Sequence, residues 1–268
     1  MKDGKIKKLL KKSIVKLIDN TVAESKIQRI FKKHEIKTHF VPIRYRIFGG
    51  LLQSLNIQFG NFIEVLLQGI ILEEKQLKII TGISGKKNIN LSLTEETDSL
   101  IDHFISDRQN NIDNNLKEKF EQLLGGIVSA QQSNNELITA KHDVDVLFQD
   151  KKGTYYYIEL KYNDDHDTGK FVDINRKFLK TYAGLVRSLE IKDVKRLKPI
   201  LYYFNQKIMK GNIYVPEDAY IYRGKKLFDE FLSMEYKDVD EYLKNISEDK
   251  ETVKIFDDLY KRIRYGKI

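Results

Sequence analysis

The sequence predicts an α/β fold in which a mixed β-sheet is flanked by helices and preceded by a helical N-terminal extension. Three observations indicate this fold class. Two β-forming runs stand close together at residues 143–148 and 155–161, an amphipathic helix follows at 168–189, and an apolar run follows that helix at 198–206. Because a helix separates the last run from the second, we expect these two strands to pair in parallel through a right-handed crossover.

Length and composition limit the kinds of protein to which the chain can belong. Domains usually run to roughly 100–200 residues, so the 268 residues are expected to form one domain with extensions. We expect a single domain over residues 1–268, with a helical N-terminal extension (1–45), a core (46–215) and a helical C-terminal part (216–268). The absence of cysteine excludes disulfides, thiol catalysis and cysteine-ligated zinc.

Membrane insertion is not expected from the sequence. No apolar run approaches the roughly 18 residues of a membrane-spanning helix. The N-terminus also lacks the uninterrupted apolar segment of a signal peptide. The sequence therefore predicts a soluble, cytoplasmic protein with no membrane partner.

The charge balance is basic. Lys and Arg total 47 against 39 Asp and Glu, which gives a net charge of +8. An excess of this kind favours a polyanionic partner such as nucleic acid, through contacts with phosphates. A Lys- and Asn-rich composition also arises from an AT-rich genome, in which case the charge is a solvated surface. Charge alone leaves both interpretations open.

Helices are expected over most of the chain before the β-forming runs. The expected elements are helices at 1–33 and 51–74, a short strand within 81–93, and further helices from 94 to 124. Apolar residues at spacings of three and four support the first two helices. Thr94, followed by acidic residues, is a capping signature for the helices that come next. Gly125 and Gly126 are expected to end them, and polar residues 131–135 to form a loop.

Charged residues occupy one face of each β-forming run. In the first run, Asp143 and Asp145 alternate with Val144, Val146 and Phe148. In the second run, Glu159 and Lys161 alternate with Tyr156, Ile158 and Leu160. If the turn at 150–153 joins the runs into a hairpin, the apolar faces coincide. The carboxylates and Lys161 then meet on the opposite face.

Carboxylates that converge in this way repel each other unless a cation lies between them, and oxygen ligands suit Mg²⁺. A neighbouring lysine can position a water molecule and neutralise charge that develops on a phosphate. The triplet Glu-x-Lys alone carries little information, because this chain contains seven. Only the triplet at Glu159 ends a β-run that follows a second run with acidic residues. The alternative is an ordinary hairpin whose outward face is charged.

These residues, in this order of elements, resemble the PD-(D/E)XK nuclease superfamily. More narrowly, the chain is similar to type II restriction endonucleases of the HinfI and TdeIII group. The segments that carry the resemblance are "FGNFIE" from Phe59, "KHDVDVLF", "YYYIELK", the helix after "DTGK", "YYFNQ" and the tail from Tyr222. The resemblance implies Mg²⁺-dependent hydrolysis of double-stranded DNA that leaves 5′-phosphate and 3′-hydroxyl ends.

The resemblance also implies residue roles. Glu159 and an upstream aspartate would hold Mg²⁺ together with the main-chain carbonyl of Leu160, and Lys161 would orient the water. Alternation does not choose between the two aspartates. Asp143 is preferred because it begins the run, and Asp145 is a candidate second ligand.

Other polar residues near these runs are open to more than one interpretation. Glu64 either matches an acidic residue that many of these enzymes carry on an early helix, or forms a solvent-facing stripe with Asn61 and Gln68. We expect His142 and His166 to be surface residues. The acidic residues at 164–167 are expected to form a turn.

Candidate DNA-binding residues lie after the last β-run. Asn, Gln, Lys and Arg side chains can reach base edges in the major groove. The candidates are Asn205, Gln206, Lys207, Lys210 and Arg223. The resemblance implies a short palindromic target, with or without an unspecified central base. It also implies a homodimer, since symmetric DNA matches a symmetric protein, and a cognate DNA methyltransferase in the host.

Three alternatives remain at this point. One is a structure-specific repair or junction nuclease of the same superfamily. Another is a DNA-binding protein that has lost catalysis, although the retention of Asp143, Glu159 and Lys161 argues against this. The third is a helical interaction protein, which leaves the charges of the hairpin without an explanation.

Overall fold

The structure is a computed structural model that describes residues 14, 17–18, 23–110, 115–133 and 136–265. The helix expected at 1–33 therefore lies largely outside the described residues. The chain divides into two compact units. The sheet unit is Leu67–Ser233, and the helical unit consists of Met1–Leu66 and Met234–Ile268. These limits differ from the expected 46–215 core, because the sheet unit begins inside a long helix and extends to residue 233.

The helical unit packs described helices from early in the chain against a helix from late in the chain. Its described helices are α2 (Glu24–Glu35), the first part of α3 (Ile43–Leu72), α8 (Tyr236–Ser247) and α9 (Lys250–Tyr265). A small apolar core joins α2 and α3 to α9, and it consists of Ile27, Ile30, Ile47, Leu51, Leu259 and Ile263. Amphipathic helices such as these are stabilised mainly by burying one apolar face.

Helix α3 corrects two expectations. It starts eight residues before the expected start at 51. By length and composition alone, this helix is long and apolar enough to cross a membrane. The expectation that no such segment exists was wrong because it considered only uninterrupted apolar runs. Asn, Gln and Glu64 interrupt α3, but its many Ile, Leu, Phe and Val residues keep the helix apolar on average. A core helix of a soluble protein passes the same test.

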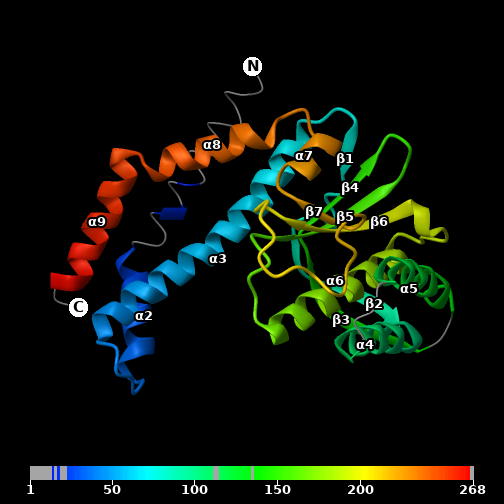
Figure 1. Cartoon of the computed structure of the whole chain (residues 1–268), viewed down its shortest axis with the longest axis horizontal. Coiled ribbons are helices and arrows are strands. Elements are labelled where there is room, and N and C mark those ends of the chain that lie inside the picture. Colours follow the sequence, from blue (N-terminus) through cyan, green and yellow to red (C-terminus); the bar gives the residue numbers. More distant parts are fainter. Residues whose placement is uncertain (1–13, 15–16, 19–22, 111–114, 134–135, 266–268) are drawn as a thin grey trace. The chain divides into compact units, whose positions relative to one another are not determined.

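The sheet unit contains a five-stranded mixed sheet with the order β1-β4-β5-β6-β7 (Figure 1). The strands are β1 (Leu77–Ile79), β4 (Val146–Asp150), β5 (Tyr155–Lys161), β6 (Leu197–Tyr203) and β7 (Ile221–Arg223). β4 and β5 form the expected antiparallel hairpin, with Val146 opposite Ile158 and Phe148 opposite Tyr156. β5 and β6 are parallel, as the crossover rule predicted. The short 3₁₀ helix Val194–Arg196 precedes β6.

Helix α6 (Thr168–Ser188) makes the crossover from β5 to β6 and covers one face of the sheet. The ring of Phe178 on α6 stacks on Tyr157 at a centroid distance of 5.6 Å. Helix α7 (Lys225–Phe231) lies on the other face, where Phe231 packs against Phe148 and Tyr156. Both faces of the β4–β5 hairpin are therefore buried, which rules out the interpretation of an outward-facing charged surface.

A second, two-stranded sheet pairs β2 (Lys86–Thr94) with β3 (Leu137–Val144). The chain changes from this sheet to the five-stranded sheet at Asp145, so the expected continuous strand over 143–148 is wrong. The main-chain N–H of Gly85 contacts the carbonyls of Val144 and Asp145 at this point. Alternation of side chains along the run could not indicate this break, because alternation does not depend on which strand is the partner.

Helices α4 (Glu95–Asn110) and α5 (Leu116–Ala130) lie next to α6 (Figure 1). The expected cap is present, since the N–H of Thr97 donates to the hydroxyl of Thr94 at 3.2 Å. Contrary to expectation, α5 continues through Gly125 and Gly126 to Ala130. Each glycine costs a helix about 1 kcal/mol, and the burial of neighbouring apolar side chains on α5 offsets this cost.

Candidate active site

Glu159 lies on β5, on the face of the sheet that α6 covers. Its side chain is fully buried. Tyr157 donates its hydroxyl to Oε2 at 2.7 Å, and the ammonium groups of Lys161 and Lys177 donate to Oε1 at 2.7 and 3.0 Å. Burial alone would raise the pKa of Glu159, but the two ammonium groups outweigh it and lower the pKa to about 2. Glu159 is thus an ionised carboxylate inside the protein.

Asp145 is the second buried carboxylate on this side of β5. It is 6% exposed, and its Oδ2 accepts the main-chain N–H of Leu160 at 2.8 Å. Lys87 is more distant, with 3.8 Å between its Nζ and Oδ1 of Asp145. Burial and the charge of Glu159 raise the pKa of Asp145 to about 7. The raised pKa means that the ionised form of Asp145 is unfavourable beside Glu159. A cation between the two carboxylates would therefore be favourable. We refer to Asp145 and Glu159 as the acidic pair.

Asp143, the preferred aspartate of the sequence analysis, has different contacts. It lies on β3 and is half-buried. Its Oδ1 accepts the main-chain N–H of Asn88 on β2 at 2.8 Å. It is Asp145, and not Asp143, that accepts a hydrogen bond from β5. The interruption between strands β3 and β4 therefore gives the two aspartates different partners, although alternation had placed them on one face.

Lys161 follows Glu159 by two residues and reaches the same face of the sheet. Its Nζ also donates to the carbonyl of Leu160, at 3.0 Å. Burial would lower the pKa of Lys161, but Glu159 and Asp145 outweigh it and raise the pKa. The side chain is 23% exposed. Lys161 is therefore a charged group at the rim of the acidic pair.

Lys177 was missed by sequence reasoning. It lies on α6 and contacts the same carboxylate oxygen as Lys161. Its side chain borders the apolar face of α6 formed by residues such as Ile174 and Phe178. The sequence could have pointed to Lys177 only by its position at the edge of the buried face of α6. Because the chain is rich in lysine, many other lysines have such a position.

His142 and His166 are half-buried, which corrects the expectation of surface residues. His142 Nδ1 lies 3.1 Å from the hydroxyl oxygen of Thr181 on α6. Burial, followed by the charge of Lys177, lowers the pKa of His142. Burial and the nearby Lys170 also lower the pKa of His166. Both imidazoles are thus favoured in their neutral form.

Glu64 is 7% exposed on α3, whereas Val65 beside it is 54% exposed. Of the two interpretations of Glu64, the solvent-facing stripe is therefore wrong, because α3 is rotated so that Glu64 faces the protein interior. Glu64 belongs to the helical unit and the acidic pair belongs to the sheet unit. A role for Glu64 in catalysis remains a prediction.

Asp164 is a buried anchor, not merely part of a surface turn. Its carboxylate accepts the main-chain N–H groups of Met209 and Gly211 at 2.9 and 3.1 Å, and Arg223 Nη2 at 3.0 Å. Burial alone would raise the pKa of Asp164, but these donors outweigh burial and lower the pKa. The side chain is fully buried. Asp164 therefore holds the loop at 204–220 in place.

Arg223 does not match its expected role in reading bases. It is 9% exposed, and its guanidinium binds Asp164 and Glu217 and lies 4.6 Å from the centroid of the Tyr203 ring. Burying this ion pair removes it from the surface that DNA could touch. The expectation for Arg223 is corrected because the sequence did not reveal its two carboxylate partners.

The remaining DNA-binding candidates lie on the loop at 204–220. The loop starts beside the end of β5, where the N–H of Asn205 donates to the carbonyl of Tyr162 at 2.9 Å. Gln206, Lys207 and Lys210 are exposed. Gln206 packs closely on Gly224, where an added Cβ would lie 2.0 Å from Gln206 Cγ. Four of the five candidates thus lie on one loop, and this loop starts next to the end of the strand that carries Glu159 and Lys161.

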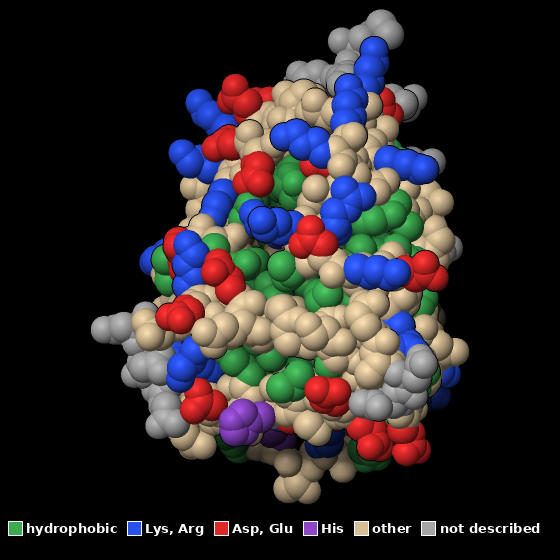
Figure 2. All heavy atoms as spheres, turned by 90° about the vertical axis from the view of Figure 1, so that its right-hand side faces the viewer, with side chains coloured by type: hydrophobic (Ala, Val, Ile, Leu, Met, Phe, Trp, Pro, Cys, Tyr) green, Lys and Arg blue, Asp and Glu red, His purple; other side chains and the backbone are tan. Residues whose placement is uncertain are grey.

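The surface around the sheet unit carries charges of both signs. On the face shown in Figure 2, Lys and Arg side chains alternate with Asp and Glu, and hydrophobic side chains lie between them. The basic excess of the chain does not form a uniform patch on this face. On this face, therefore, charge alone does not mark where DNA would bind.

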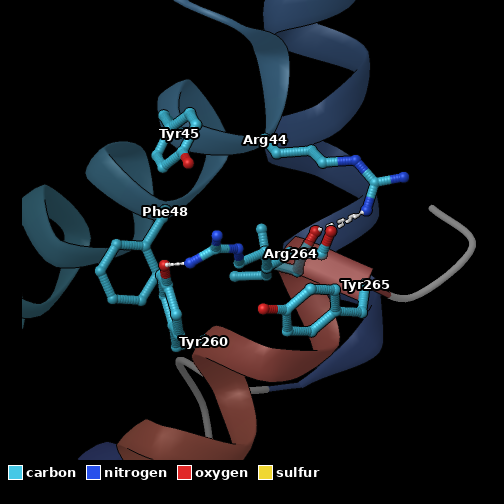
Figure 3. A pocket seen from close by; sticks show the side chains of 7 residues that line it. Arg44, Tyr45, Phe48, Tyr260, Arg264 and Tyr265 are labelled. Atoms are coloured by element: carbon cyan, nitrogen blue, oxygen red, sulfur yellow. Dashed lines mark hydrogen bonds between the residues drawn. The ribbon is translucent and has the colours of Figure 1, made fainter.

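Two cavities elsewhere share no lining residue with the acidic pair. One, of about 250 Å³, lies in the helical unit and is lined by Arg44, Tyr45, Phe48, Tyr260, Ile263, Arg264 and Tyr265 (Figure 3). There Arg264 donates to the hydroxyl of Tyr260 at 2.6 Å, and Arg44 donates to the carbonyls of Ile263 and Arg264. The other, of about 430 Å³, includes Gln131, Arg187 and Glu190. Neither combines carboxylates in the way the acidic pair does.

The donors around the acidic pair fit a hard divalent cation. Among the described residues no group of three or more His, Asp and Glu side chains is placed to hold a metal ion. The set consists of two carboxylates, Asp145 and Glu159, with the carbonyl of Leu160 beside them. All three candidate ligand atoms are oxygens, which Mg²⁺ prefers. Mg²⁺ usually keeps several water ligands besides one or two carboxylates.

Comparisons with known proteins identify the family of the chain. The family model described as type II restriction endonuclease, HinfI, matches residues 2–247. The chain is 48% identical over 262 residues to the type II restriction enzyme HinfI of Haemophilus influenzae, covering 97% of this chain and 98% of that protein. No solved structure matches the chain. The chain therefore belongs to the HinfI family of type II restriction endonucleases and is a site-specific deoxyribonuclease.

Proposed function

We propose that this restriction endonuclease is Mg²⁺-dependent and uses a PD-(D/E)XK arrangement formed by Asp145, Glu159 and Lys161. The observation that carries the proposal is the buried acidic pair with a charged lysine at its rim. Asp145 takes the place that sequence analysis gave to Asp143, since its carboxylate contacts β5. Asp143 keeps its bond to β2.

In this arrangement each residue has a distinct task. Asp145, Glu159 and the carbonyl of Leu160 would together hold the cation. Bound Mg²⁺ supplies polarisation of a phosphate oxygen and stabilises negative charge in the transition state. The Lys161 ammonium, which already lies within 3.0 Å of the Leu160 carbonyl, orients the attacking water and neutralises charge on the phosphate.

The reaction that follows is in-line hydrolysis of a phosphodiester. The water oxygen bonds to phosphorus as the bond from phosphorus to the 3′ oxygen breaks. The 3′ oxygen gains a proton and leaves as a hydroxyl group, and the phosphate stays on the 5′ end. Burial of the acidic pair strengthens the electrostatic effect of the charged groups on this step.

We further propose that the chain cuts a short palindrome, with or without an unspecified central base, as a homodimer. Asn205, Gln206, Lys207 and Lys210 are proposed to contact DNA, because their loop begins beside β5. In the cytoplasm of the host, a cognate methyltransferase would protect the same sequence. Arg223 is left out because it is buried.

The test is cleavage of unmethylated phage DNA by the purified protein, with Mg²⁺ and with EDTA, followed by sequencing of the ends. Lys161→Ala is compared with Lys151→Ala, which removes an exposed lysine from the turn between β4 and β5. We expect discrete Mg²⁺-dependent fragments that share one short sequence, lost in Lys161→Ala and retained in Lys151→Ala.

Two results would contradict the proposal. Smears or nicks at structural features of the DNA would indicate a structure-specific nuclease. Sequence-specific binding without cleavage, under all metal conditions, would indicate a DNA-binding protein without catalysis. Cleavage that persists in EDTA would contradict only the dependence on Mg²⁺.

A further inference from the structure

Two lysines share one carboxylate oxygen in this site, and only one of them belongs to the β5 strand. Lys161 and Lys177 both donate to Oε1 of Glu159. Tyr157 occupies Oε2. Oε1 therefore already accepts two hydrogen bonds, which is as many as it has lone pairs, and a cation can bind this oxygen only if one of the two lysines moves away.

Lys177 is the donor that can leave most easily. Its side chain is 36% exposed, against 23% for Lys161. Lys161 has a second acceptor in the carbonyl of Leu160, and Tyr157 is fully buried under α6. The long Lys177 stem starts on α6, so its ammonium can turn into water without disturbing the sheet.

Charge balance favours the same movement. The two carboxylates of the acidic pair face the ammonium groups of Lys161 and Lys177, and Lys87 lies 3.8 Å from Asp145. The site therefore carries no net negative charge. A divalent ion would add two positive charges beside these lysines. Loss of one ammonium from Oε1 relieves part of the repulsion between like charges and frees a lone pair of that oxygen for the ion.

We propose that Lys177 is a positioning residue that competes with the divalent cation for Glu159. This inference rests on the proposed role of the acidic pair in holding a cation. Without the ion, Lys177 holds the buried carboxylate ionised and in place. When the ion binds, Lys177 gives up Oε1. The affinity of the site for the cation is therefore lower than the acidic pair alone would provide.

The test measures Mg²⁺ affinity without DNA by isothermal titration calorimetry. Lys177→Met removes the ammonium but keeps an unbranched stem, and we expect Mg²⁺ to bind about tenfold more tightly, because a unit charge beside the ligand is gone. Lys177→Arg, which keeps the charge, should bind within about threefold of the natural chain. A general structural defect would weaken binding, so the sign of the change separates competition from disruption.

Lys180→Met is the matched control. Lys180 lies one turn further along α6 and pairs with Asp98, whose carboxylate is not part of the site. Its loss should leave Mg²⁺ affinity unchanged. Unchanged or weaker binding by Lys177→Met, with normal binding by the natural chain, would overturn this inference alone. If the natural chain binds no Mg²⁺ and cuts no DNA, both the inference and the proposed function fail.

Discussion

Two buried groups of charges lie near the same end of β5, and they differ in how well their carboxylates are satisfied. Asp164 receives two main-chain N–H groups and the guanidinium of Arg223, and its pKa is lowered. Asp145 receives one main-chain N–H and faces another carboxylate, and its pKa is raised to about 7. The charge of Asp164 is therefore satisfied by the protein alone, whereas the charge of Asp145 is not.

The difference separates a structural carboxylate from a functional one. A buried charge with a full set of donors stabilises the surrounding chain, and breaking it is costly. A buried carboxylate that has few hydrogen-bond donors and lies beside another carboxylate is unfavourable for folding, and such a carboxylate is typical of sites that bind ions or carry out catalysis. On this basis Asp164 maintains the loop at 204–220, and Asp145 serves the reaction.

The largest expected effect is on cleavage by Asp145→Asn. We expect kcat/KM for DNA cleavage to fall at least about 1,000-fold, or roughly 4 kcal/mol of transition-state stabilisation, because an amide is a poor ligand for Mg²⁺. The measurement is the rate of plasmid cutting at a saturating Mg²⁺ concentration. A loss smaller than about tenfold would show that Asp145 is not a metal ligand.

The next largest effect is expected on stability, when the buried carboxylate of Asp164 is replaced. Asp164→Asn should lower the free energy of unfolding by about 3 kcal/mol, because it leaves Arg223 buried with only Glu217 as its ionic partner. Urea unfolding measures this. Asp165→Asn is the control, since Asp165 is exposed and its 3.5 Å ion pair with Lys210 is worth less than about 1 kcal/mol. Equal stability of the two variants would contradict the anchoring role.

The stabilising effect of Asp164 should also depend on pH. Its pKa is lowered in the folded state, so its contribution is complete above the unfolded value of about 4 and is lost as pH falls through the folded value. The stability difference between the natural chain and Asp164→Asn should therefore be constant from pH 5 to 7 and shrink below about pH 4. A difference that grows on acidification would have the wrong sign.

A smaller effect is expected when stability is measured on Asp145→Asn. The raised pKa means that the ionised carboxylate is unfavourable in the folded state. A neutral amide can still accept the N–H of Leu160. We therefore expect the free energy of unfolding, without Mg²⁺ at pH 8, to rise by about 1 kcal/mol. A decrease would show that the acidic pair is a structural group like that of Asp164.

The smallest effect is expected for Asp143→Asn. The amide oxygen can replace the carboxylate oxygen as acceptor for the N–H of Asn88. We expect cleavage within about threefold of the natural chain and stability within about 0.5 kcal/mol. Cleavage assays on Asp143→Asn and Asp145→Asn side by side decide between the two aspartates. A 1,000-fold loss for Asp143→Asn alone would restore the choice made from the sequence.

Local patterns in the sequence predicted the central part of the fold correctly. Alternation of apolar and polar residues predicted the β4–β5 hairpin. Apolar residues at a spacing of 3.6 predicted the buried face of α6. The rule for crossovers between strands predicted the parallel pairing of β5 with β6. Glu159 and Lys161 were placed on one face because they are two residues apart on one strand. All of these features depend on residues close together in the chain.

The features that the sequence did not predict depend on distant partners. The break at Asp145 is determined by pairing with β2, more than fifty residues earlier. Lys177 becomes a site residue only because α6 packs over β5. The ion pair between Arg223 and Asp164 joins residues 59 positions apart. A charge pattern along the chain contains no information about these contacts.

The division of the chain has a consequence for synthesis on the ribosome. The sheet unit is one uninterrupted segment, and all the groups around Asp145 and Glu159 lie within it. The core of the helical unit joins α2 and α3 to Leu259 and Ile263 near the C-terminus. That core can close only after translation has reached α9. During synthesis, therefore, the segment with the acidic pair is complete before the core residues of α2 and α3 have met their partners on α9.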